Sequence, residues 1–117
     1  MNKNVAKLLV AILGVLLIVA TAYAAITNLA WDANTEADLA GYKLYQSTVG
    51  PTGPFVYVKT IAKGTLTTAT ADLPDGTYWW VLTAYDNAGN ESGYSNVVTR
   101  VIDTAAPTAP RNFRVVP

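Results

Sequence analysis

Short runs of alternating apolar and polar residues are the feature that most constrains this chain. From Ala25 onward, apolar residues recur at every second position, and Gly, Pro, Asn and Asp separate the runs. In the most aromatic run, 77–86, one face would carry Tyr78, Trp80, Leu82 and Ala84. A repeat of two matches the alternation of side chains along a β-strand, whereas a helix would repeat every three to four residues. The pattern therefore predicts strands.

The spacing of these runs predicts an all-β fold. The expected strands are 29–32, 41–45, 55–61, 65–73, 77–86 and 95–102. Turn-forming residues lie between them, most densely at 50–54, which reads Gly-Pro-Thr-Gly-Pro. Several short strands with a turn every eight to twelve residues are typical of an antiparallel sandwich of two sheets.

The register of the strands also predicts which side chains meet between the sheets. On each strand the large apolar residues occupy one face, and that face should point inward. The expected core residues are Leu29, Trp31, Tyr42, Leu44, Leu73, Tyr78, Trp80, Leu82 and Ala84. No cysteine is present, so this core has no disulfide to support it.

Composition excludes several classes of function. The chain has no Cys and no His, which removes thiolate nucleophiles, His-dependent triads and the usual zinc and haem ligands. Eight Lys and Arg balance eight Asp and Glu, so no basic face is expected for nucleic acid. The oxygen ligands at Asp86, Asn87, Asn90 and Glu91 fit a tight turn better than a calcium loop. We expect no catalytic, cofactor or metal site.

The N-terminus has the layout of a secretory signal. Lys3 and Lys7 precede an apolar run at 8–20, and small residues follow it. Ala22 and Ala24 suit a signal-peptidase site, so residues 1–24 are expected to form a signal-peptide helix that is cleaved after Ala24. An uncleaved anchor is the alternative, since residues 8–26 are mostly apolar. Either way the remaining chain would be secreted or held at the cell surface.

Four segments of the chain together resemble a fibronectin type III domain. They read LAWD at 29–32, DLAGYKLY at 38–45, LPDGTY at 73–78 and TAYDNAGNES at 83–92. The resemblance implies an immunoglobulin-like sandwich over 25–102, with strands named B, C, C′, E, F and G. It makes Trp31 the core tryptophan of strand B. It makes Tyr78 the corner tyrosine, whose hydroxyl bonds to nearby backbone.

The chain departs from that family at both ends of the domain. A complete domain starts with a strand A that pairs with strand B, and too few residues lie between Ala24 and Trp31 to supply one. A Pro-punctuated linker at 103–110 is followed by 111–117, which looks like a strand A, with Phe113 and Val115 on one face. This spare strand could fold back on its own domain, insert into another subunit, or be a loose tail of a longer protein.

A second set of apolar side chains is expected on the opposite face of the predicted sheet. These residues are Tyr45, Trp79, Val81 and Tyr85. Aromatic residues exposed on a sheet suit a protein interface or the stacking of sugar rings, and they also stabilise sheets as cross-strand pairs.

These expectations combine into one functional hypothesis and two alternatives. The chain is expected to be an exported, non-catalytic module that binds an extracellular protein or a cell-surface polymer, or acts as a spacer. It would touch a membrane only through an uncleaved N-terminal segment. One alternative is a structural subunit that self-associates through the spare strand. The other is a carbohydrate-binding accessory module.

Overall fold

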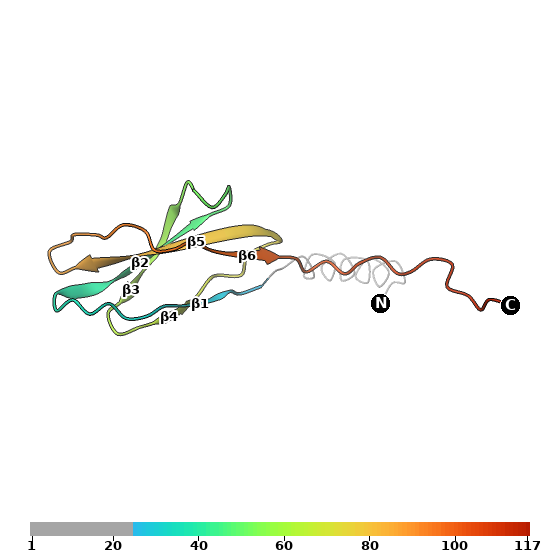
Figure 1. Ribbon diagram of the computed structural model, residues 1–117, viewed down its shortest axis with the longest axis horizontal. Helices are drawn as coiled ribbons and strands as arrows, with labels where there is room; N and C mark the ends of the chain where they lie inside the picture. Colours follow the sequence, from blue (N-terminus) through green and yellow to red (C-terminus); the bar gives the residue numbers. More distant parts are fainter. Residues whose placement is uncertain (1–24) are drawn as a thin grey trace, which may run out of the picture.

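The computed structural model describes residues 25–117, which form antiparallel strands in two sheets (Figure 1). The predicted signal segment and its cleavage residues, Ala22 and Ala24, lie outside the described residues. The strands are β1 (Asn28–Ala30), β2 (Leu39–Ser47), β3 (Val56–Ala62), β4 (Thr67–Ala69), β5 (Gly76–Asp86) and β6 (Val98–Ile102). Residues 25–117 contain no helix of the length and apolarity needed to cross a membrane.

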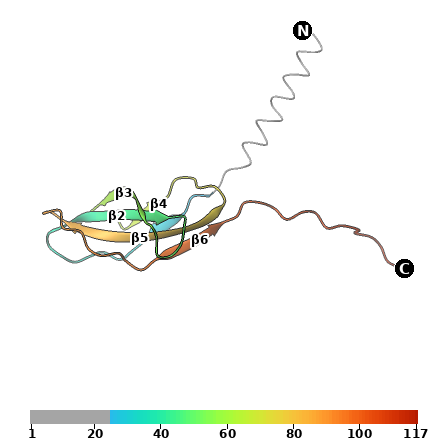
Figure 2. The ribbon, with the colours of Figure 1, turned by 90° about the horizontal axis from the view of Figure 1, so that it is seen from above.

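The two sheets differ greatly in size. The larger has the order β3-β2-β5-β6, and the smaller consists of β1 and β4 alone. The chain passes from one sheet to the other between β1 and β2, between β3 and β4, and between β4 and β5. Figure 2 shows the long strands β2 and β5 side by side, as their register requires. The small sheet therefore has to cover a much wider one.

The core lies between the sheets. Its buried members are Leu39, Tyr42, Leu44, Ile61, Tyr78, Trp80 and Ile102. Of the nine residues expected in the core, Tyr42, Leu44, Tyr78 and Trp80 are among these. The other five are partly buried and pack against the cluster: Leu29, Trp31, Leu73, Leu82 and Ala84. The half-buried set comes mainly from the small sheet and from the part of β5 beside the 92–100 segment.

Two expected strands are shorter than predicted, because threonine and serine side chains replace parts of the backbone ladder. In the expected strand 65–73, the Thr70 hydroxyl accepts the Thr27 N–H, and regular pairing is confined to β4. In the expected strand 95–102, the Ser95 hydroxyl accepts the Leu82 N–H and the Ser92 hydroxyl accepts the Ala84 N–H. Regular strand therefore begins only at Val98.

The turn that leads into β5 is fixed by a tyrosine. The Tyr78 hydroxyl donates a 2.7 Å hydrogen bond to the Pro74 carbonyl, four residues earlier in the chain. Its ring is buried and stacks against Trp80, with 5.9 Å between the ring centroids. The side chain thus ties the turn to the core.

Removing the Tyr78 hydroxyl should destabilise the fold. Tyr78→Phe leaves a carbonyl without its donor, and we expect it to lower the free energy of unfolding by about 1 kcal/mol. Tyr57→Phe is the matched control: its hydroxyl bonds only to exposed Thr60, so a change below about 0.5 kcal/mol is expected. Urea unfolding followed by tryptophan fluorescence measures both, and equal effects would contradict the proposed tie.

A glycine permits close packing where β2 departs from regular pairing with β5. The register shifts between Leu39 and Gly41. A Cβ atom at Gly41 would lie 3.1 Å from Cε1 of Tyr85, and nearer still to the backbone carbonyl oxygen of Ile61. The carbonyl contact cannot be relieved without a shift of the strands, and the Tyr85 ring would also have to move slightly.

Gly41→Ala should therefore cost about 1 to 3 kcal/mol of unfolding free energy, as is typical of overpacking. Gly50→Ala is the control, because a Cβ atom there meets no atom within 4 Å. The same urea titrations compare the two variants. A Gly41→Ala protein as stable as the Gly50→Ala protein would show that β2 has room at this point.

Candidate functional site

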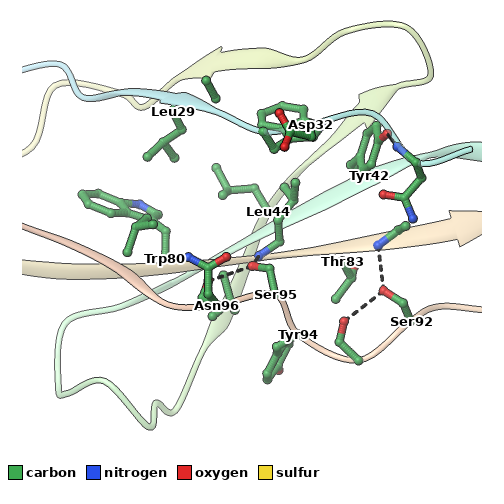
Figure 3. Close-up of a pocket in the computed structure, with 18 of the residues that line it drawn as sticks. Leu29, Asp32, Tyr42, Leu44, Trp80, Thr83, Ser92, Tyr94, Ser95 and Asn96 are labelled. Atoms are coloured by element: carbon green, nitrogen blue, oxygen red, sulfur yellow. Dashed lines mark hydrogen bonds between the residues drawn. The ribbon is translucent and has the colours of Figure 1, made fainter.

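A groove of about 880 Å³ opens between the two sheets. One wall is β1, and the other is the 92–100 segment that leads into β6 (Figure 3). Side chains from both sheets form its floor: Leu29, Trp31, Leu44, Trp80 and Leu82. Asn28, Asp32, Ser92, Ser95 and Asn96 are among the polar residues that line it. The partly buried edge of the core, at Leu29, Trp31 and Leu82, thus borders the groove.

The wall formed by β1 has unpaired backbone groups. Trp31 N–H donates to the Leu66 carbonyl, and Thr70 N–H donates to the Thr27 carbonyl. Because bonded and non-bonded pairs alternate in an antiparallel ladder, the N–H and C=O groups of Asn28 and Ala30 point away from β4. Among residues 25–117, β1 pairs only with β4, so this edge is free to accept another strand.

The opposite wall is exposed throughout. Every residue from 91 to 101 is exposed, including Tyr94, Val97 and Val98. Ser92 and Ser95 hold this wall to β5 through the hydroxyl bonds described above. An apolar floor beside an unpaired strand edge is the arrangement that strand addition of an extended peptide requires.

Trp31 is the aromatic side chain that links the floor to the free edge. Its ring packs edge-on against Tyr42, with 5.3 Å between centroids. Its indole nitrogen is buried and has no hydrogen-bond acceptor among residues 25–117. Buried polar groups usually have a hydrogen-bond partner, so the Trp31 indole N–H is an unsatisfied donor at this wall of the groove.

The groove has opposite charges at its two ends. Arg100 lies at one end and donates 2.9 Å bonds to the Ile26 carbonyl and to the Thr27 hydroxyl. Asp32 lines the other end, which adjoins a second hollow of about 270 Å³. We call this the acidic end: Asp32 lines the groove there, and Glu36, Asp38, Asp86 and Glu91 line the second hollow. Lys43 forms an ion pair with Glu91 at 3.3 Å. Within residues 25–117, the other four carboxylates form no ion pair.

The expected aromatic surface on the other face of the large sheet is differently organised. Val81 is only 2% exposed, so placing it on an exposed surface was wrong. It lies opposite Tyr45, and Tyr45 packs edge-on against Tyr57 and Tyr94. These rings, together with Phe55 against Tyr94, form a cluster of four aromatic side chains, of which Tyr57 and Tyr94 are exposed.

Trp79 and Tyr85 lie outside that cluster. Both are half-buried, and within 25–117 neither forms a ring pair. The Lys43 ammonium lies over the Tyr85 ring, 5.1 Å from its centroid. The four expected residues thus do not form one surface. Sequence reasoning missed Tyr57 and Tyr94, and only the alternation around Tyr57 could have indicated its place.

Glu91 connects the aromatic cluster to β2 and β5. Its carboxylate accepts hydrogen bonds from the Tyr45 hydroxyl and, at 3.0 Å, from the Thr83 hydroxyl. The bond to Glu91 raises the pKa of Tyr45 to about 12. The same bond lowers the pKa of Glu91, with smaller contributions from Thr83 and Lys43.

The Tyr45 bond should be visible in an alkaline titration. Since the folded state holds this proton more tightly than the unfolded chain, the stability from the bond is present below about pH 10 and is lost between about 10 and about 12. Difference absorbance of phenolate should show a late-titrating component from Tyr45. Glu91→Gln should return that tyrosine toward pH 10, whereas Asp38→Asn should not; identical titrations in all three proteins would contradict the assignment.

Asp86 serves the turn after β5. Its carboxylate accepts the N–H groups of Ala88 and Asn90, at 3.0 and 2.8 Å, and the Asn90 side-chain amide at 3.0 Å. These bonds lower the pKa of Asp86, the Asn90 side-chain amide contributing most. In the described part of the chain, no group of three or more His, Cys, Asp or Glu is arranged to hold a metal ion.

The tail extends away from the domain (Figures 1 and 2). Two bonds from Thr104 to the Asp75 carboxylate hold its start, at 2.8 and 3.1 Å. Phe113 and Val115 are 96% and 97% exposed. In this structure the spare strand is therefore not folded back into the groove.

Comparisons of the chain with protein-family models, with curated proteins and with solved structures found no match.

Proposed function

We propose that the protein is an exported, non-catalytic module of the fibronectin type III kind, which binds an extended segment of an extracellular protein by strand addition in the groove. Export rests on the basic and apolar N-terminal pattern around Lys3 and Lys7. Binding rests on one observation: the free edge of β1 borders an apolar floor that belongs to the core.

Three features support the family part of the proposal. Pairing of β1 with β4, and the order β3-β2-β5-β6, match strands B and E and strands C′, C, F and G. The Tyr78 bond to Pro74 has the form of a tyrosine corner. The edge left free on β1 is the one on which strand A of this family would lie.

The groove supports strand addition more strongly than binding of a small molecule. A strand that pairs with β1 gains backbone hydrogen bonds at Asn28 and Ala30, which depend little on sequence. Every second side chain of that strand would enter the groove above Leu29 and Trp31, and burial of each large apolar side chain contributes about 1.5 to 3 kcal/mol before ordering costs. A bound strand would therefore form hydrogen bonds with the β1 edge and bury its apolar side chains on the groove floor.

A labelled peptide can test the groove. A fluorescent heptapeptide of alternating Val and Thr should raise its anisotropy on binding to the monomeric wild-type protein. Ala30→Pro removes an N–H that points into the groove and should weaken binding at least tenfold, or about 1.4 kcal/mol.

Ala69→Pro is the matched control for this experiment. Ala69 is the neighbour of Asn28 in the β1–β4 pairing, so its N–H also points out of that pair, but toward the edge remote from the groove. Binding by this variant should equal that of the wild type. Equal binding by Ala30→Pro, or no anisotropy change with the wild type, would reject the groove as a strand-binding site.

A further inference from the structure

We propose that the segment bound in the groove is the 111–117 tail of a second copy of this chain, so that copies join head to tail. This inference rests on the proposed strand-binding groove and names its occupant. Among residues 25–117, β1 has a free edge, and the 111–117 tail beyond β6 has the sequence pattern of a strand but belongs to no sheet. Three properties of the tail fit it to the groove.

The first property is its apolar pattern. Phe113 and Val115 alternate with polar or outward-facing residues, so both would enter the groove from a paired strand. They are almost completely exposed in the structure, which is unusual for two large apolar side chains two positions apart. Seven extended residues span about 23 to 25 Å, enough to follow β1 and the residues that flank it.

The second property is charge. Arg111 and Arg114 are the tail's charged side chains, and the carboxylate that lines the groove, Asp32, lies at the acidic end beside the carboxylates of the second hollow. β1 runs from the Arg100 end toward Asp32. A strand antiparallel to β1 therefore starts at the acidic end, with Arg111 beside Asp32 and far from Arg100. Opposite charges then meet.

The third property distinguishes a second copy from fold-back. β6 ends beside Gly76, the start of β5, and so at the Arg100 end of its own groove. A tail that entered the groove directly from there would run parallel to β1 and would place Arg111 close to Arg100, whereas an antiparallel entry would require the 103–110 linker to run back along the whole groove first. Parallel pairing is slightly less stable, and the like charges repel. Thr104 is also bonded to Asp75, which directs the linker away from its own groove.

Such a contact joins two different surfaces of the same molecule. A joined pair still offers a free tail at one end and a free groove at the other, so the contact propagates and gives chains of copies. This arrangement is the self-associating structural role among the alternatives raised by the sequence.

The test uses the chain as it is exported, in three variants. Val115→Asp places a charge in the donor face of the tail, at a position so exposed that the domain should fold unchanged. Val116→Asp is the matched control, because it adds the same charge on the opposite face of the tail. Ala30→Pro blocks the acceptor edge and leaves the tail intact.

Sedimentation velocity over a concentration series gives the masses. Wild type and Val116→Asp should form oligomers that grow with concentration, with association constants within twofold of each other. Val115→Asp and Ala30→Pro should each weaken association at least tenfold. An equimolar mixture of these two should stop at dimers, since one supplies only a groove and the other only a tail.

Three results would overturn the inference: a wild type that stays monomeric, a Val115→Asp protein that assembles like wild type, or a mixture that stays monomeric. If the Val–Thr heptapeptide still binds in those cases, the groove remains a strand-binding site and only its occupant is wrong. If the heptapeptide does not bind either, the proposed function fails as well.

Discussion

The structure depends on the burial of Trp80, Tyr42 and Leu44 between two sheets of very unequal width. The large sheet supplies these side chains, and the small sheet covers them with three residues in each strand. Trp80 also donates its indole N–H to Gln46, so the centre of the core is both packed and hydrogen-bonded. Away from this centre the cover thins, and Leu29, Trp31 and Leu82 are only half-buried. The groove is a direct result of that imbalance.

The unequal width of the two sheets also makes the free edge of β1 the best candidate for a binding site. On the outer face of the large sheet, the Tyr45 ring packs against its neighbours and its hydroxyl is bonded to Glu91, so the chain satisfies its own groups there. At the groove, the N–H and C=O groups of Asn28 and Ala30 that point away from β4 meet no second strand within 25–117, and apolar side chains lie beside them. An extended ligand would pair with these backbone groups and would also cover the apolar side chains.

Sequence reasoning predicted the strands well and their limits poorly. Alternation along 77–86 placed Tyr78 and Trp80 inward, because a strand buried on one face repeats strictly every second residue. It misjudged Val81, since Val81 lies opposite Tyr45, whose ring packs against Tyr57 and Tyr94 from other parts of the chain. It also extended the last strand too far, because nothing in the sequence shows that Ser92 and Ser95 use their hydroxyls within the ladder. The groove follows from pairing across the sheet, which no local pattern contains.

The linker between Ile102 and the tail determines how stiffly neighbouring copies would be coupled. Pro107 and Pro110 restrict the backbone to extended, polyproline-like conformations, and eight residues of this kind span about 25 Å. A Pro-containing linker of this kind keeps the two domains apart but can bend at its ends. A polymer of such copies would have an axial repeat that depends on the length of the linker as well as on that of the domain. It would bend at the ends of the linkers and not within the folded domains.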